Sequence, residues 1–306
     1  MPAAQLAENY SNGLRSVWAR IHRYGAPPPA VRAQGQQNWG NRMQYLFTLA
    51  LLGLGALLGT SARADGSHLD RVWAAKELRV CIWPDYYGIT FRNPHTQQLT
   101  GLDVDMARAF AKDLGVEVRF VDSTFTALVA DLTQGRCDIA MFGISITPAR
   151  AEKLHFTQPY LASDIYAITT RTNRRIRTWS DIDKPGVVVA ILKDTAVGEA
   201  VRERLKAATL VVADSARMRD QEVESGRADV FMTDFPYSRR MLDNVDWARL
   251  VSPLAPYHVT PRAYAVAPGD ERWLARIDQF VASVKRDGRL LDSARRHKLE
   301  PIIAAQ

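Results

Sequence analysis

Short apolar runs alternate with segments of helical periodicity over most of the chain. The runs 78–82, 116–121 and 137–143 predict strands because they are short and rich in aliphatic residues. Between the first two lies an amphipathic segment that we expect to form a helix with Asp103 as its N-cap. Thr124 is expected to cap a second helix before the third strand. This order of elements predicts right-handed parallel crossovers in an α/β sheet.

The same pattern recurs in the second half of the chain. Strands are predicted at 187–192, 209–213 and 228–234, with one helix beginning at Thr195 and another over 218–226. Two similar strand–helix units in about 240 residues predict two lobes rather than one large domain.

Two extended segments, 164–172 and 262–269, connect these halves. We therefore predict a fold of two α/β lobes joined by a two-segment hinge. The first lobe is assigned residues 65–168 together with 262–306, and the second lobe residues 169–261.

The beginning of the chain has the pattern of an export signal. Residues 45–59 are uncharged and mostly apolar, and this run is shorter than the roughly twenty residues that span a bilayer. Arg42 precedes it, and an Ala-Arg-Ala cleavage pattern follows at 62–64. We predict a signal peptide cleaved after Ala64 and a periplasmic protein; a retained membrane anchor is the alternative. Residues 1–64 are excluded from the fold, either as an extended presequence or because translation starts nearer Met43.

The charge of the chain is concentrated in this presequence. The 306 residues carry a net charge of +7, but residues 1–64 contain six arginines and one acid. The remaining 242 residues hold 34 basic and 32 acidic side chains, a net charge of +2. This balance excludes the broad positive surface that would bind nucleic acid.

Candidate binding residues follow the ends of the predicted strands, where ligands bind in open α/β sheets. They are aromatic, hydroxyl-bearing or charged residues and one glycine: Trp83, Tyr86, Phe125, Gly143, Ser145, Arg150, Thr195 and Asp234. An arginine can hold a carboxylate with two hydrogen bonds, while an aspartate accepts from an ammonium group. An arginine on one wall and an aspartate on another therefore suit a zwitterion.

Each of these residues also has a purely structural interpretation. Arg150 suits a solvated or ion-paired position, and Asp234 suits the N-cap of a helix that starts at Phe235. Ser145 and Thr195 suit caps or turns. The aromatic residues suit the core. Their shared position after strands is what favours a binding site.

Three long segments of the chain resemble a known family. These segments, at 101–121, 131–164 and 226–234, are similar to periplasmic solute-binding proteins of extracellular family 3, the amino-acid receptors of ABC importers. The resemblance covers nearly all of residues 78–299. It implies a type II periplasmic binding protein fold and a ligand enclosed by hinge closure. It also implies a permease in the inner membrane as partner, and we expect a monomer.

The resemblance also implies roles for individual residues. Arg150 would hold the α-carboxylate of the ligand, with Ser145 before it, and Asp234 would accept from the α-amino group. Thr195 matches a hydroxyl at the turn into the second lobe. Tyr86 and Phe125 match the residues that enclose the ligand side chain.

Several positions depart from the family pattern. Trp83 stands where receptors for basic amino acids place an aspartate, which argues against a long cationic ligand. Gly143 stands where serine is common, so a polar contact there depends on the backbone. Trp83, Tyr86 and Phe125 predict an aromatic box for an apolar or aromatic ligand. A non-amino-acid organic anion stays open.

Two other functions fit the same resemblance. A cyclohexadienyl or arogenate dehydratase-like enzyme is one, but the glutamate expected as its general acid aligns with Val197 or Gly198, and Glu199 should point elsewhere. A stand-alone periplasmic sensor is the other. We expect no catalytic residue, metal or cofactor, because common enzyme motifs and metal-ligand spacings are missing. Cys81 and Cys137 are expected to be two buried thiols, because strand pairing makes a bridge geometrically doubtful.

Overall fold

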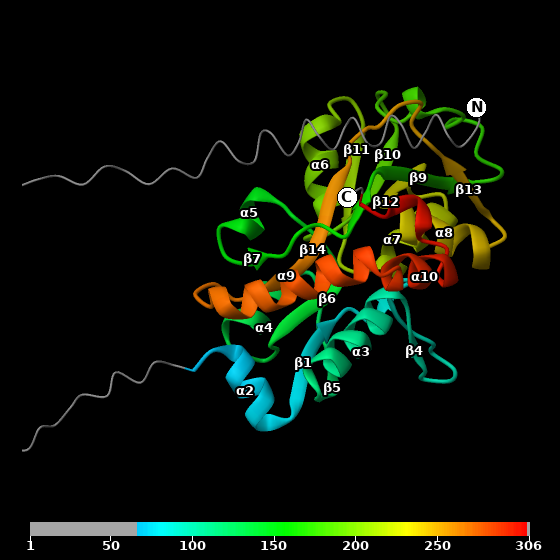
Figure 1. Ribbon diagram of the computed structural model, residues 1–306. Helices are drawn as coiled ribbons and strands as arrows, with labels where there is room; N and C mark the ends of the chain where they lie inside the picture. The colour runs from blue at the N-terminus through cyan, green and yellow to red at the C-terminus, as the bar shows by residue number, and fades with distance from the viewer. Residues whose placement is uncertain (1–65, 305–306) are drawn as a thin grey trace, which may run out of the picture.

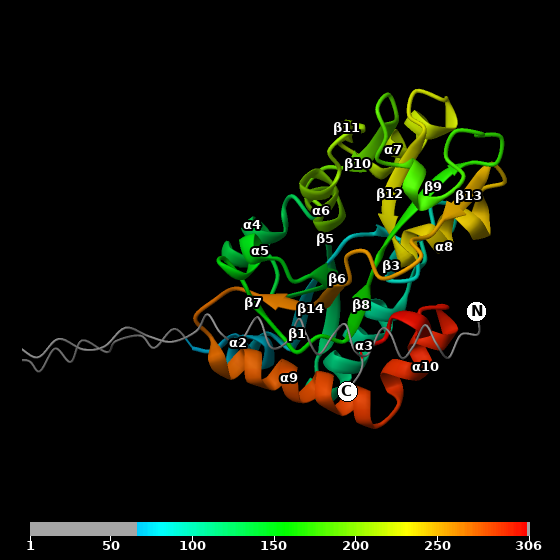
Figure 2. The ribbon, with the colours of Figure 1, turned by 90° about the horizontal axis from the view of Figure 1, so that it is seen from above.

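The computed structural model describes residues 66–304, which fold into two α/β lobes with one mixed sheet each (Figure 1). In Figure 2 the second sheet and its helices form one body, and the first sheet with its helices forms the other. The predicted α/β fold of two lobes is confirmed by this arrangement.

The first sheet has the strand order β5-β1-β6-β14-β7, with β8 also paired to β14. Its strands are β1 (Glu77–Ile82), β5 (Glu117–Asp122), β6 (Ile139–Ser145), β7 (His155–Phe156), β8 (Leu161–Ser163) and β14 (Thr260–Val266). Strand β1 runs parallel to both β5 and β6, so their carboxyl ends lie at one edge of the sheet. The strand order reverses at β1, which is where ligands bind in such sheets.

Helices cover both faces of this sheet. They are α2 (His68–Ala75), α3 (Leu102–Leu114), α4 (Leu128–Thr133), α5 (Pro148–Ala151), α9 (Glu271–Arg286), α10 (Arg289–Arg296) and the 3₁₀ helix η2 (Glu300–Ile302). On one face Phe110 packs against Trp273 and Phe280, with ring centroids 5.6 and 4.8 Å apart. A small hairpin sheet, β2 (Asp85–Tyr86), β3 (Thr90–Arg92) and β4 (Leu99–Thr100), packs on the same lobe.

The second sheet has the order β11-β10-β12-β9-β13. Its strands are β9 (Ile165–Thr170), β10 (Val188–Leu192), β11 (Thr209–Ala213), β12 (Val230–Asp234) and β13 (Ala248–Val251). The helices around it are η1 (Trp179–Asp181), α6 (Ala196–Arg204), α7 (Ala216–Glu224) and α8 (Phe235–Asn244). Apolar clusters lie on each face of the sheet and make this lobe a separate core.

The chain passes twice between the two sheets. It leaves the first sheet after Ser163 and returns at Thr260, so β9, which includes the predicted boundary at 168, pairs within the second sheet. The buried carboxylate of Asp164 accepts from the backbone N–H groups of Ile165, Tyr257 and His258 at 2.7–2.9 Å. One side chain therefore ties the two connecting segments together.

Two predicted helix starts are wrong. Helix α3 begins at Leu102 with Gly101 as its N-cap, and Asp103 is buried inside the first turn. Helix α4 begins at Leu128, because Thr124 accepts from the backbone N–H of Ala127 in a preceding turn. The Asp103 carboxylate instead accepts from the distant Gly143 N–H, whereas the Thr124 hydroxyl caps only the turn that precedes α4.

The expectation of two free thiols is also wrong. Cys81 and Cys137 form a disulfide with their Cα atoms 5.5 Å apart, and both residues are buried. Cys81 pairs with Ala140 in the β1–β6 register, and β6 begins only at Ile139. Cys137 therefore lies in the turn before the strand, where it is free of the pairing geometry that made a bridge doubtful.

Candidate functional site

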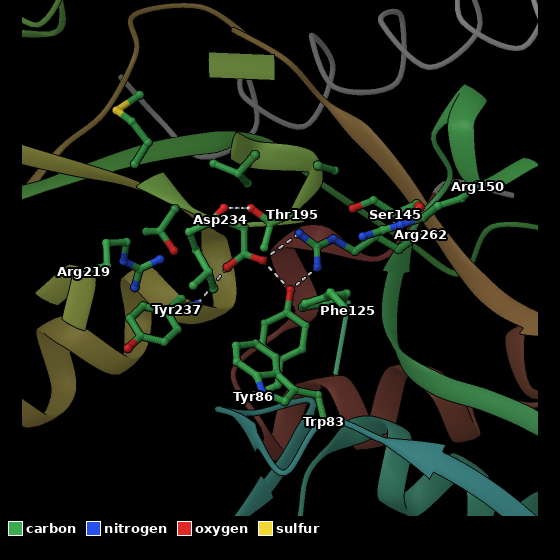
Figure 3. Close-up of a pocket in the computed structure, with 15 residues that line it drawn as sticks. Trp83, Tyr86, Phe125, Ser145, Arg150, Thr195, Arg219, Asp234, Tyr237 and Arg262 are labelled. Atoms are coloured by element: carbon green, nitrogen blue, oxygen red, sulfur yellow. Dashed lines mark hydrogen bonds and ion pairs between the residues drawn. The ribbon is translucent and has the colours of Figure 1, made fainter. Parts of the chain in front are cut away.

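Seven of the eight predicted site residues line one cavity between the two lobes (Figure 3). Its volume is about 40 Å³, which is room for a few water-sized molecules. The first lobe contributes Trp83, Tyr86, Phe125, Ser145 and Arg150, and the second contributes Thr195 and Asp234. The eighth, Gly143, lies behind the wall. Sequence reasoning did not select Arg219, Tyr237 and Arg262, which also line the cavity.

Three aromatic rings form the wall on the side of the first lobe. The ring centroid of Trp83 lies 5.2 Å from those of both Tyr86 and Phe125, and the last two are 6.0 Å apart. Phe125 also packs on Phe142 of strand β6, which anchors it to the core. The three predicted aromatic residues therefore form a cluster of tilted and edge-on rings.

Arg150 is a buried cation on the same wall. Thr147 caps helix α5 and Pro148 starts it, which holds Arg150 one turn beyond the end of β6. Its guanidinium donates to the carbonyl oxygens of Ser145 and, across the cleft, of Asp194, each at 3.1 Å, and lies 5.3 Å from the Phe125 centroid. No carboxylate between residues 66 and 304 lies within ion-pair distance of it. Burial lowers the pKa of Arg150 below its usual value.

Asp234 stands opposite, at the end of β12. One carboxylate oxygen accepts from the backbone N–H of Tyr237 at 3.0 Å, so Asp234 is the N-cap of α8, as its alternative interpretation proposed. The other oxygen accepts from Arg262 Nη2 at 2.7 Å and from the Tyr86 hydroxyl. Each carboxylate oxygen therefore already has at least one protein donor.

Of the three wall residues that were not predicted, Arg262 makes the most contacts with predicted site residues. It lies on β14 beside Ser145 of β6, and its Nη1 donates to the Tyr86 hydroxyl and, at 3.0 Å, to the Gly143 carbonyl. Burial alone would lower the pKa of Arg262, but the Tyr86 hydroxyl and the Asp234 carboxylate raise it overall. The available signal was an arginine at the start of an apolar strand, since a buried arginine requires partners.

Gly143 supports Arg262 from behind. Its φ is +60°, and a Cβ atom there would lie 3.1 Å from Tyr86 Cε1 and 3.4 Å from Arg262 Nη1, so glycine permits the close approach. Its N–H donates to the buried Asp103 carboxylate at 2.8 Å, and the Tyr160 hydroxyl donates to the same carboxylate at 2.5 Å. Burial raises the pKa of Asp103 to about 7, against the opposing effect of these hydrogen bonds.

Thr195 has a structural role at the cavity wall. Its hydroxyl donates to the Leu192 carbonyl at 2.8 Å and accepts from the Gly198 N–H at 3.1 Å, which caps helix α6. The neighbouring Asp194 has a φ of +56°, and its carboxylate accepts from Thr126 of the first lobe at 2.8 Å. This turn therefore contacts the first lobe as well as lining the cavity.

A match to a protein family covers both lobes. The family model of the bacterial extracellular solute-binding proteins, family 3, matches residues 78–298. The chain belongs to this family. It is also 32% identical over 252 residues to the cyclohexadienyl dehydratase of Pseudomonas aeruginosa, which covers 82% of this chain and 93% of the relative. The L-cystine-binding protein of Escherichia coli is 24% identical over 81% of this chain and 94% of its own length.

Two solved structures of binding proteins agree with the fold. The ancestral amino acid-binding protein AncCDT-1, a precursor of cyclohexadienyl dehydratase, has a TM-score of 0.69 and 31% identity over 75% of this chain and 99% of its own. A putative binding component of an ABC transporter from Wolinella succinogenes, complexed with lysine, has a TM-score of 0.67 and 25% identity over 72% and 95%. The type II periplasmic binding protein fold expected from the sequence is thus confirmed.

The remaining expectations concern the export signal, membrane insertion and metal binding. The apolar run at 45–59 and the cleavage pattern at 62–64 lie outside the described residues. Within residues 66–304 no helix combines the length and hydropathy of a membrane span. The same part of the chain holds no group of three or more His, Cys, Asp or Glu side chains that could bind a metal ion.

Proposed function

We propose that this family 3 protein is an exported receptor that captures a small carboxylate in the interlobe cavity and delivers it to an ABC importer of the inner membrane. The main support is Arg150, a buried guanidinium without a carboxylate partner in the described chain, which faces an aromatic wall. A ligand carboxylate supplies the missing negative charge. The family, whose relatives include amino-acid-binding proteins, supports the same function.

The proposed mechanism is closure of the two lobes on the ligand. Arg150, Ser145 and the aromatic residues of the first lobe take the ligand first. The second lobe then brings the Thr195 turn and Asp234 to the other side, moving on the two connecting segments that Asp164 joins. Contacts made only in the closed state shift the equilibrium toward it.

Export is part of the proposal. We infer that the segment before residue 65 is a signal peptide cleaved after Ala64 and that the mature protein is a periplasmic monomer. The Cys81–Cys137 disulfide supports this, because such bonds persist in oxidising compartments. The two lobes are proposed as the units that move. The boundaries assigned from the sequence at 168 and 262 fall inside β9 and β14, so the proposed units divide in the connecting segments after Ser163 and before Thr260.

A second candidate function is that of a dehydratase. The observation that favours it is the 32% identity of this chain to a cyclohexadienyl dehydratase. General acid catalysis needs an acidic group within hydrogen-bond reach of the substrate. Among the described residues Asp234 is the only carboxylic acid on the cavity wall, and Arg262 and Tyr86 occupy it. Glu199 is exposed and outside the wall. These contacts support a receptor more strongly than an enzyme.

One experiment separates the two candidates. Thermal unfolding is measured against a panel of amino acids and organic acids, with a prephenate turnover assay on the same preparation. A ligand present at one hundred times its dissociation constant stabilises the folded state by about 2.7 kcal/mol. Stabilisation without turnover is the expected result. Turnover would support the dehydratase instead, and silence across the panel would contradict the receptor.

A further inference from the structure

The cavity wall carries more positive than negative charge. Three arginines, Arg150, Arg219 and Arg262, line it, and Asp234 is the only carboxylate among its described residues. Arg219 has its own partner outside the wall, Asp220, at 2.9 Å. Arg262 and Asp234 neutralise each other. The charge of Arg150 is left over, so the cavity suits an anion better than a neutral zwitterion.

An ammonium group would have to compete with protein donors for the one carboxylate on the described wall. Its Oδ2 atom already accepts from Arg262 and Tyr86, and the side chains of Arg262 and Asp234 are 4% and 12% exposed. An ammonium that replaced Arg262 at Asp234 would leave a buried guanidinium without its counterion. Breaking a buried ion pair in this way is strongly unfavourable.

Arg262 also keeps an unused donor. Its Nε atom is buried and has no hydrogen-bond partner within residues 66–304. Nη1 and Nη2 are held by Gly143, Tyr86 and Asp234. A ligand ammonium has no lone pair to accept from a guanidinium, so beside Arg262 it gains no hydrogen bond and meets a like charge.

From these three observations we propose that Arg262 determines the class of ligand: a small organic acid without a free ammonium group, such as a 2-hydroxy acid or a dicarboxylic acid. This inference rests on the proposed receptor function. Arg262 occupies the place at Asp234 where an α-ammonium would bind. Arg150 holds the carboxylate, and a hydroxyl or second carboxylate oxygen of the ligand faces Arg262.

The test compares ligands that differ only in this group. Calorimetry measures the affinity of the wild-type protein for the pairs alanine and lactate, phenylalanine and phenyllactate, aspartate and malate, and glutamate and 2-hydroxyglutarate. For the pair that binds, the acid without an ammonium group is expected to bind at least about tenfold more tightly. Arg262→Gln frees Asp234 and should reduce this preference at least about tenfold or reverse it.

Two further variants keep the result interpretable. Arg240→Gln removes another arginine that joins the lobes, outside the cavity, and should change both members of a pair equally. Asp234→Asn keeps a capping side chain for α8 but removes the charge. Under this proposal it retains affinity for the organic acid, whereas a site that reads an ammonium group loses most of its binding.

The outcomes distinguish a failure of the role proposed for Arg262 from a failure of the receptor function. Tighter binding of the amino acid by the wild-type protein overturns the role of Arg262 and leaves the receptor function supported. An unchanged preference in Arg262→Gln, with Asp234→Asn losing its affinity, also overturns it. Failure of every probe to bind contradicts the receptor function and the inference together.

Discussion

Arg240 of helix α8, in the second lobe, donates from Nη1 to the carboxylate of Asp85, in the first lobe, at 2.7 Å. A second ion pair on the same helix joins Asp243 to Lys298 at 3.3 Å. Both pairs lie outside the cavity, so they stabilise the closed arrangement of the lobes without touching a ligand.

Loss of the Arg240–Asp85 ion pair should shift the two lobes toward an open arrangement. Arg240→Ala removes a half-buried contact worth up to about 1 kcal/mol, which changes an open–closed ratio severalfold. We expect a larger radius of gyration in small-angle X-ray scattering without ligand. Arg227→Ala is the matched control, because Arg227 pairs with Glu222 inside the second lobe and does not reach the first lobe. Equal radii for the two variants would show that the Asp85 contact does not hold the lobes.

Asp103 should make the first lobe less stable as the pH rises. Burial raises the pKa of this carboxyl to about 7 in the folded state, above the ordinary value of 3.8. Between these values the folded protein binds more protons than the unfolded chain, so the free energy of unfolding falls as pH increases, by at most about 1.4 kcal/mol per pH unit. Asp103→Asn should remove this slope in denaturant titrations from pH 4 to 7.

Asp105, two residues after Asp103 on helix α3, should change stability with pH in the opposite direction. Burial would raise its pKa, but hydrogen bonds from His297, Arg296 and Ser293 lower it overall. Its contribution to stability is present above its ordinary pKa and is lost as the pH falls through the folded value. Asp105→Asn should therefore cost most stability at neutral pH. Parallel pH profiles for the two variants would contradict both assignments.

Reduction of the Cys81–Cys137 disulfide should destabilise the first lobe. The bond closes a loop with a sequence separation of 56 residues, and bonds of this kind stabilise proteins by about 2–4 kcal/mol. The chain contains only these two cysteines, so a reductant acts on one bond. We expect a lower unfolding temperature with reductant, and no response in the Cys81→Ala, Cys137→Ala double variant. Two titratable thiols in the unreduced, denatured protein would contradict the bond.

Much of the site could be predicted because its signals are local. Thr147 and Pro148 fix the short helix that presents Arg150, and the position of Asp234 at the end of a strand marks both a cap and a cavity wall. The aromatic cluster follows from Trp83 and Tyr86 lying just after the first strand. In each case residues that are adjacent in the sequence determine where the side chain of the site lies.

The rest depends on contacts between distant segments. Arg262 meets Tyr86 across 176 positions of sequence, and nothing near either residue indicates the other. Asp103 was expected to cap a helix because its true partner, the N–H of Gly143, is 40 residues away. The disulfide was missed because the start of β6 at Ile139, two residues beyond Cys137, decides whether pairing constrains the bridge.

The central claim is that Arg150 binds a ligand carboxylate, and calorimetry of Arg150→Ala tests it most directly. The titrant is the panel member that stabilises the wild-type protein most, and Arg227→Ala serves as the control arginine on the surface. A charged hydrogen-bonded contact contributes about 1.5–3 kcal/mol, so we predict binding weakened by at least about tenfold with the unliganded unfolding temperature near that of the wild type. Unchanged affinity in Arg150→Ala would contradict the account.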